Sequence, residues 1–195
     1  LIILLTLPVI FIVSFLIYLE DKGPIFYTQK RSGLNGKIIK IIKFRSMHVN
    51  AEIDGIQWSK NNDKRITRIG RILRALRIDE LPQLFCVLFG SMSLIGPRPE
   101  RPEIEKKLLK KIPYYKSRYI LKPGISGWAQ VNYHYGASVS DTKQKLSYDI
   151  YYISNFSLFL DLLIFFKTIK LVLNAKGYKP KKIIDNNPNL SLIHI

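Results

Sequence analysis

An uncharged apolar segment, residues 1–19, limits the possible folds of this chain more than any other feature. It is long enough for a transmembrane helix. A secretory signal is disfavoured, because no basic region precedes it and no small-residue cleavage site follows it. Pro8 removes a backbone donor and is expected to kink or break a helix near its middle. Two structures are possible: a kinked helix that spans the membrane, which composition slightly favours, or a helix that breaks and returns to the same face of the membrane. Either structure attaches the chain to a membrane.

Composition narrows the class of protein. The chain has 195 residues and a formal net charge of +17, from 31 Lys and Arg against 14 Asp and Glu. This charge indicates an anionic partner, such as nucleic acid, lipid headgroups or a phosphorylated substrate. Because 47% of the residues are apolar, the chain is not a disordered basic tail. Cys86 is the only cysteine, which excludes a disulfide within the chain. The chain begins at Leu1 rather than Met, which suggests a fragment that lacks an upstream region.

Helices and one hairpin are the expected secondary structure. Asn35-Gly36 is a turn signal, and the β-branched run Lys37–Phe44 after it predicts one strand of a hairpin near the membrane. Apolar residues at helical spacing predict a helix within 65–77. Residues 103–119 and 141–155 are also expected to be helical. Residues 156–173 are apolar but interrupted by charges, which fits either a helix in the membrane interface or one packed on the core.

Two adjacent carboxylates, Asp79 and Glu80, follow the arginine-rich run 65–77. As a structural feature, Asp79 is expected to be the N-cap of a helix, with Glu80 at its first position and Pro82 in its first turn. A functional interpretation uses the same geometry, because a helix N-terminus also favours a bound phosphate. An ionised Asp beside a phosphate can act as a nucleophile. The neighbouring Glu can hold Mg²⁺, which offsets phosphate charge.

Further cations lie on two other short segments. Pro97 and Pro99 restrict the backbone on either side of Arg98, which suits phosphate recognition or a plain rigid turn. Lys43 and Arg45 make the end of the predicted hairpin cationic, which fits a phosphate site or a solvated basic edge. His134 has no second His or Cys at metal-ligand spacing, so it is interpreted as an ordinary surface histidine.

Several separated stretches together resemble one family, the bacterial sugar transferases, which are monotopic phosphoglycosyl transferases. The resemblance runs in order from about residue 1 to 173, and its motifs are Gly23-Pro24-Ile25-Phe26-Tyr27, Lys43-Phe44-Arg45-Ser46-Met47, Asp79-Glu80-Leu81-Pro82-Gln83-Leu84, Gly96-Pro97-Arg98-Pro99, Pro123-Gly124-Ile125-Ser126-Gly127 and Tyr148-Asp149. Each motif is weak alone, but their combination and order are specific. The stretch from Trp128 to Tyr152 is closer to larger members that carry extra upstream transmembrane helices.

The resemblance implies a reaction. A UDP-sugar would donate a sugar phosphate to Asp79, UMP would leave, and polyprenyl (undecaprenyl) phosphate would then accept the sugar phosphate. This is the first membrane step of exopolysaccharide, O-antigen or glycoconjugate assembly. Glu80 would be the Mg²⁺ ligand, and four cations would bind substrate: Lys43, Arg45, Arg74 and Arg98. The expected location is the cytoplasmic face of the bacterial inner membrane, in contact with its lipids. No nucleic acid is expected, and a homodimer is a candidate assembly.

The resemblance also changes the expected fold. Pro8 would mark the break of a re-entrant membrane helix, against the compositional preference for a span. The predicted fold is mixed α/β and mostly helical, with that membrane helix at 1–20, a catalytic domain at 21–175 and a basic, polar tail at 176–195. Interfacial amphipathic helices and a small β-hairpin belong to the catalytic domain.

Two positions depart from the family pattern, and other functions remain open. Cys86 stands where relatives usually have Asn and Ser91 where they have an acid, so no role is carried over to either. The alternative function is a membrane-tethered basic module without catalysis, which binds nucleic acid through the arginine run or acts as an adaptor.

Overall fold

The computed structural model describes residues 2–53, 55, 63–133 and 138–174. Within these residues the chain is mostly helical, with two small two-stranded sheets. The predicted α/β class with a mostly helical content is therefore confirmed. His134 and the predicted tail at 176–195 lie outside the described residues.

The apolar N-terminal segment forms one helix, α1 (Ile2–Asp21). Its stretch Ile3–Asp21 is long and apolar enough to cross a membrane, and only 11% of the apolar window is buried against the rest of the chain. The helix runs through Pro8 without interruption, and the predicted re-entrant course of this segment stays a prediction.

The hairpin forms where it was predicted. Strands β1 (Phe26–Ser32) and β2 (Ile38–Phe44) pair antiparallel in a register that sets Phe26 opposite Phe44. A 3₁₀ turn, η1 (Leu34–Gly36), joins them. Asn35 and Gly36 both have positive φ, 54° and 73°, which explains why an Asn-Gly pair occupies this turn.

The segment around the two carboxylates differs from the prediction. Helix α2 (Arg68–Ala75) is capped by the Thr67 hydroxyl, which accepts the Gly70 N–H at 2.9 Å. Asp79 is not an N-cap: it lies in a 3₁₀ turn, η2 (Ile78–Glu80), and helix α3 (Gln83–Leu88) begins only after Pro82. The turn closes through i→i+3 bonds, in which Glu80 N–H donates to Arg77 O and Leu81 N–H donates to Ile78 O.

The second half of the chain surrounds a short parallel sheet. Strands β3 (Ser93–Ile95) and β4 (Gly124–Ser126) pair in parallel, an arrangement that the sequence did not predict. The remaining elements are α4 (Pro102–Leu109), η3 (Tyr115–Ile120), α5 (Trp128–Asn132), α6 (Val139–Ser154) and α7 (Leu158–Leu173). The helix predicted at 103–119 is therefore shorter than expected, whereas α6 and α7 match their predictions.

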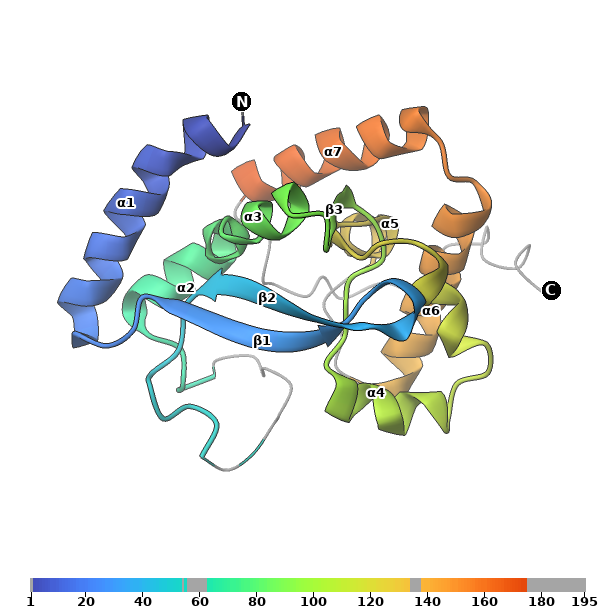
Figure 1. Cartoon of the computed structure of the whole chain (residues 1–195), viewed down its shortest axis with the longest axis horizontal. Helices are drawn as coiled ribbons and strands as arrows, with labels where there is room; N and C mark the ends of the chain where they lie inside the picture. The colour runs from blue at the N-terminus through green and yellow to red at the C-terminus, as the bar shows by residue number, and fades with distance from the viewer. Residues whose placement is uncertain (1, 54, 56–62, 134–137, 175–195) are drawn as a thin grey trace.

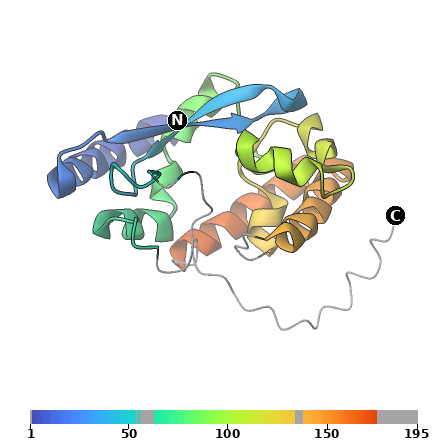
Figure 2. The ribbon, with the colours of Figure 1, turned by 90° about the horizontal axis from the view of Figure 1, so that it is seen from below.

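Figure 1 shows the hairpin running between α1 and α2 at one end and α4 at the other, with α3 and α7 on the side of α1's N-terminus. Seen from below in Figure 2, the hairpin lies along one side of the molecule and most helices lie on the other. The core is divided into small clusters, and one of them joins Val13 and Ile17 of α1 to Phe44 and Leu73. Helix α1 therefore shares a core with the rest of the chain.

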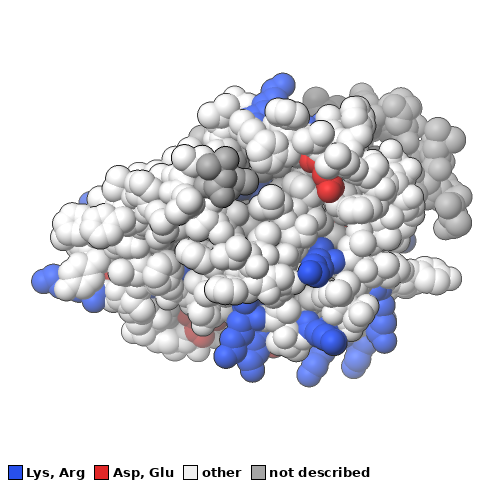
Figure 3. All heavy atoms as spheres, turned by 45° about the horizontal axis from the view of Figure 1, so that its top comes forward, with Lys and Arg blue, Asp and Glu red and all other residues white. Residues whose placement is uncertain are grey.

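A large apolar surface covers one face of the molecule. In Figure 3 this face is mostly uncharged, and most of the Lys and Arg side chains lie along its lower border. Exposed large side chains on three helices contribute to the apolar surface: Phe11 and Phe15 on α1, Leu88 at the end of α3 with Phe89 after it, and Phe159 and Phe166 on α7. Apolar patches that face water to this extent mark an interaction surface.

Candidate active site

Three separate elements bring charged side chains to one point. Asp79 and Glu80 are on η2, Lys43 is the next-to-last residue of β2, and Arg98 is on the turn that follows β3. Arg77, directly before η2, has a left-handed backbone with φ 54°. Residues other than glycine rarely adopt this backbone conformation, and the examples that exist are concentrated at functional sites. This conformation lets the chain turn sharply from α2 into the carboxylate pair.

Glu80 is buried and held by two cations. Its Oε1 accepts from Lys43 Nζ at 2.9 Å and from Arg98 Nη2 at 2.5 Å, and its Oε2 accepts from Arg98 Nη1 at 3.3 Å. Burial alone would raise the pKa of Glu80, but the charges of Arg98 and Lys43 hold it well below its usual value. Glu80 is therefore an ionised carboxylate at neutral pH. Its side chain is 7% exposed and that of Arg98 is 39% exposed, so solvent reaches the site from the arginine side.

Asp79 has the opposite character. Burial, and then the negative charge of Glu80, raise the pKa of Asp79 to about 6. Lys43, Arg74 and Arg98 act in the other direction and lower it. Asp79 is thus a partly desolvated carboxylate that is ionised at neutral pH. Adjacent carboxylates whose pKa values are pushed apart are typical of catalytic sites.

A buried ion pair supports the Arg98 turn from behind. Arg118 Nη2 donates to the Arg98 carbonyl at 2.6 Å, and it lies 2.8 Å from Asp149 Oδ2 on α6. Its Nη1 donates to the Tyr115 hydroxyl at 2.6 Å. Burial would lower the pKa of Arg118, but the charge of Asp149 raises it. Burial raises the pKa of Asp149, and the charge of Arg118 acts in the opposite direction. The pair orients the backbone that presents the Arg98 guanidinium to Glu80.

Sequence reasoning missed Arg118 altogether, and it recorded Asp149 only as part of a motif. A signal for Asp149 was present, because a single acid lies between aromatic residues on the predicted helix 141–155. Arg118 gave no comparable signal, since it follows the lysine-rich stretch that starts at Lys106.

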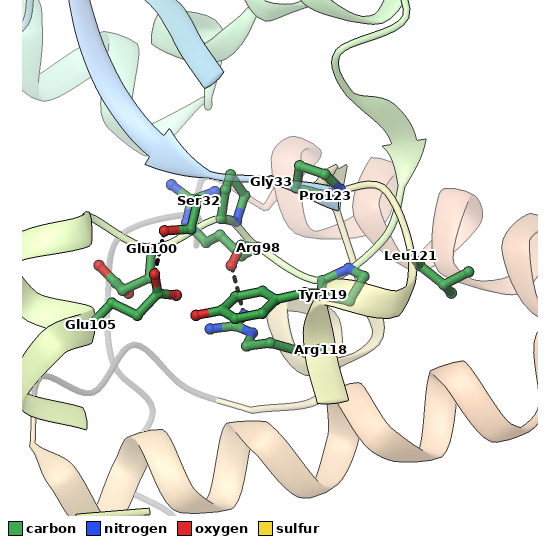
Figure 4. Close-up of a pocket in the computed structure, with 11 residues that line it drawn as sticks. Ser32, Gly33, Arg98, Glu100, Glu105, Arg118, Tyr119, Leu121 and Pro123 are labelled. Carbon is green, nitrogen blue, oxygen red and sulfur yellow. Dashed lines mark hydrogen bonds between the residues drawn. The ribbon is translucent and has the colours of Figure 1, made fainter. Parts of the chain in front are cut away.

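A pocket borders the Arg98 turn on the same side as Arg118 (Figure 4). In that view the Ser32 hydroxyl meets the Glu105 carboxylate, and Arg118 reaches the Arg98 carbonyl. The lining is polar on one side and contains two prolines of the turn; it consists of Ser32, Gly33, Pro97, Arg98, Pro99, Glu100, Glu105, Arg118, Tyr119, Leu121 and Pro123.

The structure places the predicted site residues in two groups. Lys43 and Arg98 contact Glu80, and the charge of Arg74 acts on Asp79. Arg45 does not join them, and its expected contact with substrate stays a prediction. Its guanidinium pairs with Asp21 at the end of α1, where it links this helix to the hairpin. This position follows from strand geometry, because Arg45 lies directly after β2 and at the end nearest α1.

The site offers two carboxylates, Asp79 and Glu80, as ligands for a divalent cation. Across the described parts of the chain, no three His, Cys, Asp or Glu side chains gather into a metal site. Mg²⁺ does not need such a cage, because one or two carboxylates together with substrate phosphates usually hold it. Asp79 and Glu80 fit this donor set, because they are two adjacent carboxylates on one turn.

Comparison with known proteins identifies several relatives of this chain. UDP-N-acetylgalactosamine-undecaprenyl-phosphate N-acetylgalactosaminephosphotransferase of Aeromonas hydrophila is 49% identical over 170 residues, which cover 87% of this chain and 40% of that protein. UDP-glucose:undecaprenyl-phosphate glucose-1-phosphate transferase of Klebsiella pneumoniae is 39% identical over 181 residues, covering 91% of this chain and 39% of that protein. The chain thus spans less than half the length of these two relatives.

A shorter relative matches over nearly its whole length. The exopolysaccharide production protein PSS of Rhizobium leguminosarum is 38% identical over 178 residues, which cover 88% of this chain and 89% of that protein. The sequence profile of the bacterial sugar transferases matches residues 1–175, which include α1, the Asp79-Glu80 turn and α7. This chain therefore belongs to the bacterial sugar transferase family.

Proposed function

We propose that this chain transfers a sugar phosphate from a UDP-sugar to undecaprenyl phosphate and releases UMP, through a covalent intermediate on Asp79. One observation carries the proposal: Asp79, with a pKa of about 6, lies beside Glu80, which is held ionised by Lys43 and Arg98. Such a site combines an oxygen nucleophile with the positive charge that a diphosphate requires. The names of the relatives point to UDP-N-acetylgalactosamine and UDP-glucose as the first donors to test.

The reaction would proceed in two displacements. An ionised Asp79 oxygen attacks the β-phosphorus of the UDP-sugar, and the bond from that phosphorus to the bridging oxygen breaks. The electron pair leaves with UMP, and the sugar phosphate stays on Asp79 as an acyl phosphate. An oxygen of undecaprenyl phosphate then attacks the same phosphorus, which returns Asp79 to its ionised form. No proton transfer to Asp79 is needed in either step.

Charge balance is the main contribution of the protein. Phosphoryl transfer depends on positioning and on stabilisation of phosphate charge more than on other chemistry. Arg98 is 39% exposed and can turn part of its guanidinium toward a bound diphosphate while it retains Glu80. Lys43 and Arg74 add positive charge on the Asp79 side of the site.

Glu80 is the residue that would hold Mg²⁺, with Asp79 beside it. Its Oε2 makes only the longer contact, 3.3 Å from Arg98 Nη1, so this oxygen is the better placed of the two for a metal ion. A bound ion would neutralise diphosphate charge and stabilise the leaving UMP.

The apolar surface of the protein supports the same function. The exposed apolar residues of α1, α3 and α7 fit a protein that is seated in one leaflet of a bilayer. We infer that α1 is re-entrant, bending at Pro8 and returning to the cytoplasmic face of the inner membrane. This location would bring the site to the depth of a prenyl phosphate headgroup, and the transfer would start the assembly of exopolysaccharide or a related glycoconjugate.

The test is UMP release from a panel of UDP-sugars in the presence of Mg²⁺ and detergent-solubilised undecaprenyl phosphate. Wild type, Asp79→Asn and Glu103→Gln are compared; Glu103 is an exposed carboxylate on α4 and is the matched control. Release that requires lipid, Mg²⁺ and Asp79, and that Glu103→Gln retains, is expected. No release from folded wild type with any donor would contradict the proposal and favour a binding module, for which nucleic-acid and lipid binding are then measured.

A further inference from the structure

The end of the membrane helix caps the helix that leads to the active site. Glu20 Oε1 accepts the backbone N–H of Arg68 at 2.7 Å and that of Ile69 at 3.2 Å. These are the first two residues of α2, whose initial N–H groups have no partner inside the helix. Thr67 satisfies the third through Gly70. The cap of α2 is therefore divided between its own N-cap residue and a carboxylate from α1, more than 40 positions earlier in the chain.

Helix α2 is also held close to the chain after β2 in its first turn. A Cβ atom at Gly70 would lie 2.1 Å from the Ser46 carbonyl oxygen, so only glycine allows this approach of the helix to the chain after β2. A short helix that is held at one point near its N-terminus can still tilt about that point. The two hydrogen bonds from Glu20 tie the same end of the helix to α1 and restrict this tilt.

The C-terminal end of α2 belongs to the active site. Arg74 lies in its last turn, and its charge acts on the Asp79 carboxylate. In and directly after η2, Ile78 and Leu81 pack against the cluster that contains Val13 and Ile17 of α1. A tilt of α2 would therefore move Arg74 relative to Asp79. Helix α1 restrains α2 through Glu20 at its N-terminus and through the core cluster that Leu73 shares with Val13 and Ile17.

We propose that Glu20 is a positioning residue for the transferase reaction: from the end of the membrane helix it fixes α2 and thereby sets Arg74 against Asp79. The inference rests on the proposed function for its activity readout. It adds that the membrane helix is part of the catalytic apparatus and does more than attach the protein to the bilayer.

A double-mutant cycle tests the route through Arg74. Wild type, Glu20→Ala, Arg74→Ala and the double variant are compared by UMP release with undecaprenyl phosphate. Glu20→Ala alone is expected to lower kcat about 10- to 100-fold, as small displacements of a catalytic group do. In the Arg74→Ala background the same change is expected to lower kcat less than about twofold, because coupled residues are not additive. Equal losses in both backgrounds would overturn the proposal, as would no loss.

Conservative variants separate positioning from general damage to the fold. Glu20→Gln keeps an oxygen that accepts both N–H groups and is expected to stay within about threefold of wild type. Glu20→Asp withdraws the carboxylate by one methylene, so it is a milder form of the same test if the alanine variant does not fold. Its smaller loss should again vanish in the Arg74→Ala background. The exposed control Glu103→Gln should leave kcat unchanged.

Amide hydrogen exchange gives a readout that needs no activity. Glu20→Ala is expected to speed exchange at least about fivefold in peptides that cover α2 and also in those that cover η2, because the two move together. Faster exchange confined to Arg68 and Ile69 would show a lost cap without coupling and would overturn the proposal. If wild type releases no UMP but the exchange pattern is as expected, the proposed function fails while the coupling stands.

Discussion

Arg98 donates hydrogen bonds to Glu80 from both of its terminal nitrogens, at 2.5 and 3.3 Å. The Arg98 carbonyl in turn accepts a hydrogen bond from Arg118 at 2.6 Å. Arg98 therefore connects the η2 turn to the buried Arg118–Asp149 pair. The prolines on either side of Arg98 limit its backbone, and the two contacts limit its side chain and its carbonyl. The arrangement is rigid enough to hold a guanidinium ready for a phosphate.

Arg98→Lys is expected to reduce turnover strongly although it retains the charge. A lysine presents a point charge and cannot contact both Glu80 oxygens as the planar guanidinium does. We expect kcat/KM for the UDP-sugar to fall about 10- to 100-fold, a range that reflects the loss of one or two charge-assisted hydrogen bonds. Steady-state UMP release measures it. A lysine variant with wild-type kcat/KM would show that only the charge matters.

The pH profile should report the ionisation of Asp79. Its pKa is raised to about 6, and only the ionised carboxylate attacks phosphorus. We expect kcat/KM to fall about tenfold per pH unit below the pKa of Asp79, with the limb displaced upward from the usual aspartate value. The profile is measured in a buffer series at constant ionic strength. A rate that stays level down to about pH 4.5 would contradict this assignment.

Asp79→Asn should stabilise the fold while it removes activity. Because the folded-state pKa of Asp79 is raised from 3.8 to about 6, its ionisation opposes folding. This unfavourable contribution is absent below the unfolded-state pKa, grows as the pH rises, and is complete above about pH 6. At pH 7.5 without divalent metal, we expect the variant to gain on the order of 1–3 kcal/mol in the free energy of unfolding.

Thermal and denaturant unfolding measure this gain, and the two proteins should have nearly equal stabilities at about pH 4. An equal gain at both pH values would assign the effect to something other than the charge of Asp79.

Asp149→Asn is expected to damage both stability and activity. Asp149 and Arg118 are 3% and 10% exposed, so the variant leaves a buried guanidinium without its countercharge. Breaking such a pair typically lowers the free energy of unfolding by about 3–5 kcal/mol. The Arg98 turn also loses its fixed support, so kcat should fall beyond what the unfolded fraction explains. Denaturant unfolding and kcat per folded enzyme check this, with Glu103→Gln as the control.

Local signals predicted several elements correctly. The hairpin follows from Asn35-Gly36, because both residues accept the positive φ that the turn requires. Helices α6 and α7 lie close to the segments 141–155 and 156–173 in which they were predicted. The grouping of Lys43, Glu80 and Arg98 came from a combination of motifs in the resemblance, and the structure brings these three side chains into contact.

Features that depend on distant contacts were not predicted. Strands β3 and β4 have three residues each, too few to show an alternating pattern. Asp79 suits an N-cap by type, but the left-handed Arg77 starts a 3₁₀ turn that postpones the helix until Gln83. The partners of Arg45 and Arg118 lie 24 and 31 positions away, on α1 and α6 respectively, and only the folded chain brings them together.

Detection of the covalent intermediate tests the central claim most directly. Wild type and Asp79→Asn are each incubated with UDP-N-acetylgalactosamine and Mg²⁺ but without a lipid acceptor, and the protein is then analysed by peptide mass spectrometry. The account predicts up to one equivalent of UMP and a sugar-phosphate adduct on the peptide that contains Asp79, both absent in the variant. The same experiment is repeated with UDP-glucose. If UMP release requires lipid with both donors and neither donor leaves an adduct, the covalent intermediate on Asp79 is contradicted.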